Sequence, residues 1–193
     1  MKPEEEVLES IEKIAPGRGW PIIGPERGVI LDELVVKHKP SAILEVGTLV
    51  GYSAIRMARH LKKGQKVTCV ELSENIARTA RLNFDKAGLS DRIEVVVGDA
   101  KKVLPTLRGS FDMVFLDAEK VEYLTYLKSV ERLLHKGSVV LADNVRSHAA
   151  EVADYLEYVR DSGNYKSEYR DYPIGYNVAT RNEGDAVEVS IKL

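Results

Sequence analysis

The chain has 193 residues, of which 44% are hydrophobic and 30% charged, with a formal net charge of −2. This length suffices to bury a core without disulfides or structural metals, and the absence of a strongly basic block argues against nucleic acid or an anionic membrane as a partner. No apolar run approaches the roughly 20 residues of a membrane span, and the acidic start MKPEEEVLES differs from a signal peptide. We therefore expect one cytoplasmic domain over residues 1–193 that acts on a small molecule or a protein.

Residues 1–40 predict a helical lead-in to this domain. A helix is expected over about residues 3–14, followed by the Pro/Gly-rich bend PGRGWPIIGPERG. A second helix should end at the step from Lys39 to Pro40, because a residue before proline disfavours the helical region. The sequence leaves open whether the first helix covers a binding site or forms a homodimer contact.

After the lead-in, short β-branched runs alternate with amphipathic helices. The predicted strands cover about residues 41–46, 66–72, 92–98, 112–117 and 138–143, and the predicted helices cover about residues 52–61, 74–87, 100–107, 121–136 and 149–160. Ser73 is a candidate N-cap, and Gly88 and Gly137 are candidate helix stops. The alternation predicts a parallel sheet with helices on both faces. Segments 165–173, 175–181 and 186–193 indicate that two final strands form a hairpin at one sheet edge.

The loop after the first predicted strand, LEVGTLVGYS, has features of a ligand-binding turn. In such sheets, ligands bind outside the carboxyl ends of the strands. Gly47 and Gly51 allow a tight turn, and the following helix directs free N–H groups at an anion. The spacing E-x-G-x-x-x-G differs from the G-x-G-x-x-G of dinucleotide sites, which disfavours NAD and FAD. An ordinary strand-to-helix turn explains a glycine loop about as often as a cofactor does.

Acidic residues end the second and third predicted strands. Glu71 stands 24 residues after Gly47, where a carboxylate can accept hydrogen bonds from both hydroxyls of a ribose. Asp99 is suited to accept from an adenine amino group, and Gly98 would let a flat base approach the backbone. Alternatively, Asp99 caps the helix that starts at Ala100, and Glu71 is a solvated charge. Together with the glycine loop, these residues favour a nucleoside ligand.

The fourth and fifth predicted strands end in FLDAEK and LADN. Strands joined by one right-handed crossover are expected to be neighbours, so Asp117, Asp143 and Asn144 should converge at one mouth. Unpaired carboxylates repel each other, and a hard divalent cation such as Mg²⁺ relieves that repulsion. Lys120 follows Asp117 by three residues and can reach the same mouth. A salt bridge to an aspartate also explains Lys120, but the convergence of oxygens favours a catalytic site over a surface salt bridge.

Five motifs resemble the metal-dependent O-methyltransferases typified by catechol O-methyltransferase, and more distantly caffeoyl-CoA O-methyltransferase. They are ILEVGTLVGYSAIRMARHL, CVEL, VVGDA, MVFLDAEK and VVLADNV, and the resemblance runs from about Trp20 to Arg160. It implies a Rossmann-like three-layer α/β sandwich with a mostly parallel seven-stranded sheet. It also implies transfer of a methyl group from S-adenosylmethionine to a hydroxyl of a small, catechol-like acceptor, with Mg²⁺ or another divalent cation.

The resemblance also implies roles for individual residues. The cofactor set is Glu45, Gly47, Gly51, Ser53, Glu71, Gly98, Asp99, Ala100 and Asp117. Within it, Glu45, Gly47 and Ser53 would surround the methionine part, Glu71 would hold the ribose, and residues 98–100 would line the adenine. The metal set is Asp117, Asp143 and Asn144, and Lys120 would be the general base.

The sequence departs from the family pattern around the acceptor. The family's glutamate that binds the second hydroxyl is replaced by Gly175, for which Asp171 is a loosely aligned substitute. Trp20 is kept, whereas Glu119 and His148 stand where a tryptophan and a proline are found. Solvated loop positions explain these last two better than direct substrate contact. We expect an acceptor that is larger or more polar than simple catechol.

Two other classes of function stay open. A metal-free S-adenosylmethionine methyltransferase acting on a nitrogen or a macromolecule would keep the cofactor loop and use Asp143 and Asn144 otherwise. A non-catalytic binding module would keep the nucleoside pocket without turnover.

Overall fold

Seven strands form one sheet in the computed structural model, which describes residues 1–172 and 184–193. The strands are β1 (Ala42–Val46), β2 (Lys66–Glu71), β3 (Ile93–Val97), β4 (Phe111–Leu116), β5 (Leu134–Ala142), β6 (Tyr165–Asp171) and β7 (Ala186–Lys192). The helices are α1 (Pro3–Arg18), α2 (Gly24–His38), α3 (Tyr52–Ala58), α4 (Glu74–Lys86), α5 (Ala100–Val103), α6 (Tyr123–Val130) and α7 (Ala153–Asp161). The 3₁₀ turns are η1 (Leu104–Thr106), η2 (Lys120–Glu122) and η3 (Glu131–Leu133).

The strand order is β3-β2-β1-β4-β5-β7-β6. β1 to β5 pair in parallel, as predicted, whereas β7 runs antiparallel between β5 and β6. β6 and β7 form the predicted edge hairpin, in which Asp171 lies opposite Ala186. The candidate strand segment 175–181 falls within residues 173–183, outside the described part of the chain. The mostly parallel sheet confirms the predicted α/β, Rossmann-like fold.

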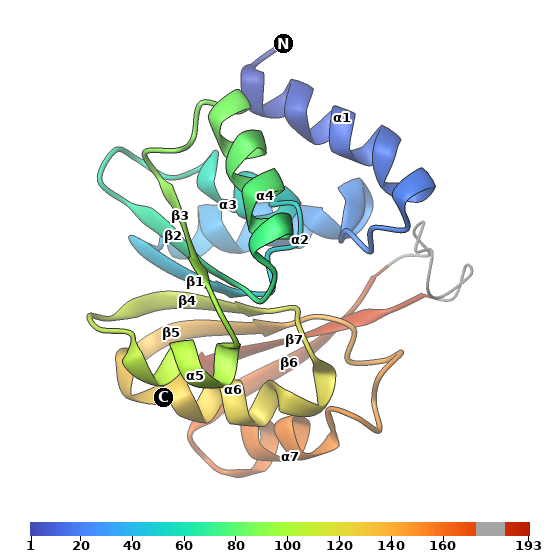
Figure 1. The fold of residues 1–193 in the computed structure, drawn as a ribbon. Helices are drawn as coiled ribbons and strands as arrows, with labels where there is room; N and C mark the ends of the chain where they lie inside the picture. Colours follow the sequence, from blue (N-terminus) through green and yellow to red (C-terminus); the bar gives the residue numbers. More distant parts are fainter. Residues whose placement is uncertain (173–183) are drawn as a thin grey trace.

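Helices cover both faces of the sheet. Figure 1 shows α1 to α4 on one side and α5 to α7 on the other. Successive side chains of a strand point to opposite faces, so Phe115 joins the core beneath α1 to α4 and Leu116 joins the core beneath α5 to α7. Both side chains are fully buried. Burial on both faces explains why the central strands are nearly continuous apolar runs.

The helix ends test several local predictions. The Ser73 hydroxyl accepts from the backbone N–H of Ile76 and caps α4, and Gly88 has the expected positive φ of 68°. The prediction of a helix as far as residue 136, stopped by Gly137, is wrong. α6 ends at Val130, and β5 already begins at Leu134. The early start of β5 comes from tertiary pairing, because Leu134 is buried opposite Phe111 before an irregularity in the β4–β5 register.

The N-terminal helix α1 packs on the layer that contains α3 and α4 (Figure 1). It runs four residues beyond the predicted end at residue 14, to Arg18, with Pro16 inside it. Its buried face includes Leu8 and Ile11, and Glu12 accepts a hydrogen bond from the Tyr52 hydroxyl at 2.5 Å. Within the described residues, no helix is both long and apolar enough to cross a membrane.

Candidate active site

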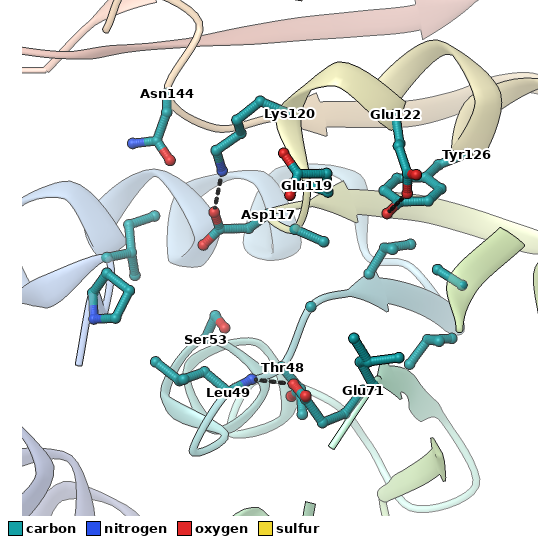
Figure 2. A pocket seen from close by; sticks show the side chains of 18 of the residues that line it. Thr48, Leu49, Ser53, Glu71, Asp117, Glu119, Lys120, Glu122, Tyr126 and Asn144 are labelled. Atoms are coloured by element: carbon teal, nitrogen blue, oxygen red, sulfur yellow. Dashed lines mark hydrogen bonds and ion pairs between the residues drawn. The ribbon is translucent and has the colours of Figure 1, made fainter. Parts of the chain in front are cut away.

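A cavity of about 670 Å³ opens at the carboxyl ends of the parallel strands. Nine predicted site residues line it: Gly47, Ser53, Glu71, Gly98, Asp99, Ala100, Asp117, Lys120 and Asn144. Figure 2 shows Glu71, Thr48 and Ser53 on one side, facing Asp117, Lys120 and Asn144 on the other. Three further predicted residues, Glu45, Gly51 and Asp143, are buried and are not among the lining residues. The fold therefore brings the predicted cofactor and metal sets to one cavity, with some members behind its wall.

The turn after β1 depends on two glycines. Gly47 has φ 90°, and a Cβ there would collide with the backbone carbonyl oxygen of Asp117 at the end of β4. Gly51 has φ 87°, and a Cβ there would collide with the Phe84 ring of α4. Any side chain would thus be both strained and too close. Gly47 lets the loop pass directly under the β4 end, whereas Gly51 serves packing behind the loop.

Glu45 acts on the cavity through its neighbours. Its carboxylate is fully buried and accepts hydrogen bonds from the hydroxyls of Thr48 and Ser53, each at 2.5 Å, and from the Cys69 thiol at 3.2 Å. Burial raises the pKa of Glu45 to about 7, although the donors oppose this shift. Because Thr48 and Ser53 line the cavity, Glu45 orients their hydroxyls instead of contacting a ligand there.

Glu71 ties the end of β2 to the loop after β1. Its Oε2 accepts from the Leu49 N–H at 3.0 Å (Figure 2), and its Oε1 accepts from the Ser73 N–H at 2.9 Å. Only 9% of the residue is exposed, so Glu71 is not a solvated strand-end charge. Each carboxylate oxygen keeps capacity for a further donor such as a ribose hydroxyl.

The end of β3 combines a cap with the cavity wall. The Asp99 side chain accepts from the Lys101 N–H at 2.9 Å and caps α5, while also lining the cavity. Both readings of Asp99 are therefore compatible. Beside it, Lys101 pairs with Glu122 at 2.5 Å, and Glu122 accepts from the Tyr126 hydroxyl at 2.5 Å. These three side chains form a polar rim of the cavity beside Asp99.

Lys120 lies between the ends of β4 and β5. Its Nζ donates to Asp117 Oδ1 at 2.8 Å (Figure 2) and to the Tyr123 hydroxyl at 2.7 Å. Tyr123 in turn donates to the backbone carbonyl of Asp143 at 3.2 Å. The salt bridge considered for Lys120 is thus present. The same contacts hold the amine at the cavity, where a bound ligand could reach it.

The side chains of Asp143 and Asn144, which follow β5, lie in different surroundings. Asp143 is 1% exposed, and its Oδ1 accepts from the Asn144 N–H at 2.8 Å. Burial and the negative charge of Asp117 raise the pKa of Asp143 to about 7, although Arg27 and Lys120 oppose the rise. Asn144 has φ 61°, which turns its side chain into the cavity wall.

The donor chemistry fits a hard divalent cation. Two carboxylates whose charges disfavour each other lie beside an amide, and positive charge there would relieve the repulsion. Within residues 1–172 and 184–193, no group of three or more His, Cys, Asp or Glu side chains is arranged to hold a metal. A cation at this mouth would therefore use the Asn144 amide oxygen together with Asp117 and Asp143.

Two buried charged residues next to this mouth were missed by the sequence analysis. Arg27 of α2 is 4% exposed, and its Nη1 lies 4.0 Å from Asp143 Oδ1 and 3.8 Å from Asp185 Oδ2. The signal for Arg27 was its place on the apolar stripe of α2, four and seven residues before Leu31 and Leu34. Asp185 precedes β7, and its place next to this mouth follows from the pairing of β7 with β5, which no local sequence signal indicates.

The residues expected around an acceptor differ in whether they reach the cavity. Glu119 is exposed and His148 half-buried, and both line the cavity. Asp171 forms an exposed ion pair with Arg146 and does not line the cavity. Gly175 lies outside the described residues, and Trp20 is partly buried against the core beside the cavity residues 21–23. The predicted substitute role of Asp171 is therefore not supported by its position.

Comparison with known proteins decides the family. The O-methyltransferase family matches residues 3–160. The chain belongs to the O-methyltransferase family. Catechol O-methyltransferase B of Danio rerio is 39% identical over 197 residues, which cover 98% of this chain and 72% of that protein. Catechol O-methyltransferase of Mus musculus is 36% identical over 180 residues, which cover 87% of this chain and 67% of that protein.

Comparison with a solved O-methyltransferase structure supports the fold. The O-methyltransferase from Bacillus cereus in complex with SAH superposes with a TM-score of 0.85 at 26% identity, covering 97% of this chain and 91% of that one. The prediction of an S-adenosylmethionine-dependent O-methyltransferase similar to the catechol enzymes is thus confirmed at the level of the family.

Proposed function

We propose that this O-methyltransferase methylates a hydroxyl of a small acceptor with vicinal hydroxyls, and that it uses a divalent cation, Mg²⁺ by preference. The carrying observation is that Asp117, Lys120 and Asn144 converge at one end of a cavity that also contains Glu71 and Asp99 (Figure 2). A nucleoside end and an oxygen-rich end within one cavity suit a reaction between a bound cofactor and a bound acceptor.

The cofactor would lie along the ends of β1 to β3. Glu71 would accept from the ribose hydroxyls with the lone pairs that its two backbone donors leave free. Gly98, with φ 152°, and Asp99 would line the adenine. The loop that begins at Gly47, together with the Ser53 hydroxyl oriented by Glu45, would surround the methionine part.

The cation would be held by Asp117, Asp143 and Asn144. Bound S-adenosylmethionine would supply an electrophilic methyl group, and the cation would supply positive charge that favours the ionised form of the acceptor hydroxyl. In its neutral form, the Lys120 amine would take the proton of that hydroxyl and become an ammonium group, and its contacts with Asp117 and Tyr123 already hold it at the cavity. The remaining contribution of the chain is to hold both reactants in line and to exclude water from them.

The acceptor would carry polar substituents beyond its two hydroxyls. Glu119, Ser147 and His148 line the acceptor side of the cavity, where an apolar wall would suit a bare aromatic ring better. His148 is held by Glu151 at 2.8 Å, so its ring is oriented before an acceptor binds. Ile22 and Leu49 also line the cavity and offer apolar contact.

The test is a methyl-transfer assay with a panel of vicinal-diol acceptors, run with Mg²⁺ and with a chelator, alongside calorimetric titration of S-adenosylmethionine. Activity on diols that a chelator abolishes supports the proposal. Activity that is indifferent to the chelator would instead assign a metal-free transferase. Cofactor binding without turnover on any acceptor would assign a binding module.

The Asp143→Ala variant separates the metal site from the cofactor site. Methyl transfer should fall by at least about a hundredfold, while the S-adenosylmethionine affinity stays within about threefold of the wild-type value. A preserved cofactor affinity also shows that the variant is folded. Glu71→Ala should do the reverse: it should lower the affinity for S-adenosylmethionine while leaving the affinity for the cation unchanged. Loss of cofactor affinity in Asp143→Ala with normal cation dependence would contradict this division of the site.

A further inference from the structure

Asp185 is a buried carboxylate that none of the proposed chemical steps uses. It is 2% exposed and lies just before β7, the antiparallel strand that pairs with β5. The backbone N–H of Val145 donates to the carbonyl of Ala186 at 3.0 Å, so the chain entering β7 runs beside the chain leaving β5. This crossing puts Asp185 directly behind Asn144.

The two oxygens of Asp185 have separate partners. Oδ1 accepts from three backbone N–H groups, those of Ala186 at 2.8 Å, Ser147 at 3.1 Å and Arg146 at 3.3 Å. Oδ2 accepts from Asn144 Nδ2 at 2.8 Å and from the Ser147 hydroxyl at 2.7 Å. Backbone N–H groups can only donate, so the atom at the Oδ1 position must be a hydrogen-bond acceptor. The atom at the Oδ2 position then determines which end of the Asn144 amide faces residue 185.

An asparagine amide has one donor end and one acceptor end. A carboxylate can bind only the donor end, so Asp185 takes the Nδ2 of Asn144 and leaves its Oδ1 on the other side. Figure 2 shows that amide oxygen turned toward Lys120 and the nitrogen turned away. Arg27 Nη1 lies 3.8 Å from Asp185 Oδ2, on the buried side of this contact.

We propose that Asp185 is a positioning residue that sets the amide orientation of Asn144, so that an oxygen and not a nitrogen faces the divalent cation. This inference rests on the proposed metal site. It assigns a role to the C-terminal hairpin, which carries no cation ligand of its own in the described residues: the hairpin supplies the acceptor that orients a ligand on β5. Residues that orient metal ligands in this way typically change metal affinity by about 10–100-fold when they are altered.

The test exchanges an acid and an amide. In Asp185→Asn, the three backbone donors keep the amide oxygen at the Oδ1 position, so the new NH₂ group faces Asn144. Asn144 must then turn its oxygen toward residue 185 and present NH₂ to the cation. In the double variant Asp185→Asn/Asn144→Asp, the carboxylate at position 144 accepts from that NH₂ group and still presents an oxygen to the cation. The double variant has the wild-type net charge.

Mn²⁺ is the probe, with free Mn²⁺ measured by electron paramagnetic resonance and Mg²⁺ added as a competitor. We expect Asp185→Asn to raise the Kd for Mn²⁺ at least about tenfold, and the double variant to restore it to within about threefold of wild type. Asp112→Asn is the matched control, because Asp112 also accepts two backbone N–H bonds and lies outside the cavity lining. Its Kd should equal the wild-type value.

Asn144→Asp alone separates orientation from charge. It carries one more negative charge than the double variant, so a purely electrostatic effect predicts that it binds Mn²⁺ more tightly. Orientation predicts weaker binding than in the double variant, because the carboxylates at positions 144 and 185 would face each other at the present 2.8 Å contact.

The outcomes are distinguishable. If wild type fails to bind Mn²⁺, the metal part of the proposed function falls and this inference falls with it. If wild type binds Mn²⁺ and Asp185→Asn binds it within threefold, or if the folded double variant shows no recovery, the inference alone is overturned. Thermal unfolding followed by circular dichroism checks the fold of each variant. Should Asp185→Asn fail to fold, comparison of the double variant with Asn144→Asp decides.

Discussion

Glu71→Gln tests whether the carboxylate at the end of β2 holds the loop after β1. Both oxygens now accept backbone donors, from Leu49 at 3.0 Å and Ser73 at 2.9 Å. A glutamine has one oxygen, so its NH₂ group must face one of those N–H groups, whichever way the amide is turned. Losing a hydrogen bond to a charged group and leaving a buried donor unpaired costs about 2–4 kcal/mol of unfolding free energy. For a chain of this size, that lowers Tm by roughly 5–15 °C.

Urea denaturation and calorimetry measure this loss of stability. Titration with S-adenosylmethionine should show the affinity lowered about tenfold or more, since the proposed hydrogen-bond acceptor for the ribose is also lost. Glu74→Gln is the control, because Glu74 lies only three residues away but is 55% exposed, and among the described residues its ion pair is with the exposed Arg81. Its unfolding free energy should change by less than about 0.5 kcal/mol. A Glu71→Gln variant as stable as Glu74→Gln would refute the claim that this carboxylate holds the loop.

The remaining predictions concern pH and backbone strain. Burial raises the pKa of Asp32, but hydrogen bonds from His60 and Arg56 outweigh burial and lower it to about 2. The stabilisation that Asp32 contributes, about 1–2 kcal/mol after solvent screening, is therefore complete above pH 3.8 and lost as the pH falls toward 2. Urea denaturation at a series of pH values should show that the unfolding free energy of Asp32→Asn falls less steeply in acid than that of wild type. Gly47→Ala should abolish methyl transfer and lower Tm, because its methyl group would meet the Asp117 carbonyl; wild-type Tm would contradict this.

Local chemistry carried most of what the sequence predicted. Ser73 caps α4 because a hydroxyl before a helical run accepts a free N–H group, whatever the rest of the fold does. The early start of β5 was missed because residues 134–136 continue a helical pattern, and only the partner strand makes Leu134 part of the sheet. The strand ends were predictable to within a few residues, so Asp117 and Asn144 could be placed at the cavity.

The sequence by itself determined the parallel alternation, the glycine-containing turn after β1 and the oxygen-rich strand ends, because hydrophobic period, turn residues and strand-end residue types are local properties. The tertiary structure alone decided that Asp143 is almost fully buried, and that Asp185 backs Asn144. The contact between Asp185 and Asn144 depends on β7 lying beside β5, which brings together two residues 41 positions apart in the chain. Local sequence patterns do not predict such a pairing, since its stability comes from hydrogen bonds and burial that exist only after the sheet has assembled.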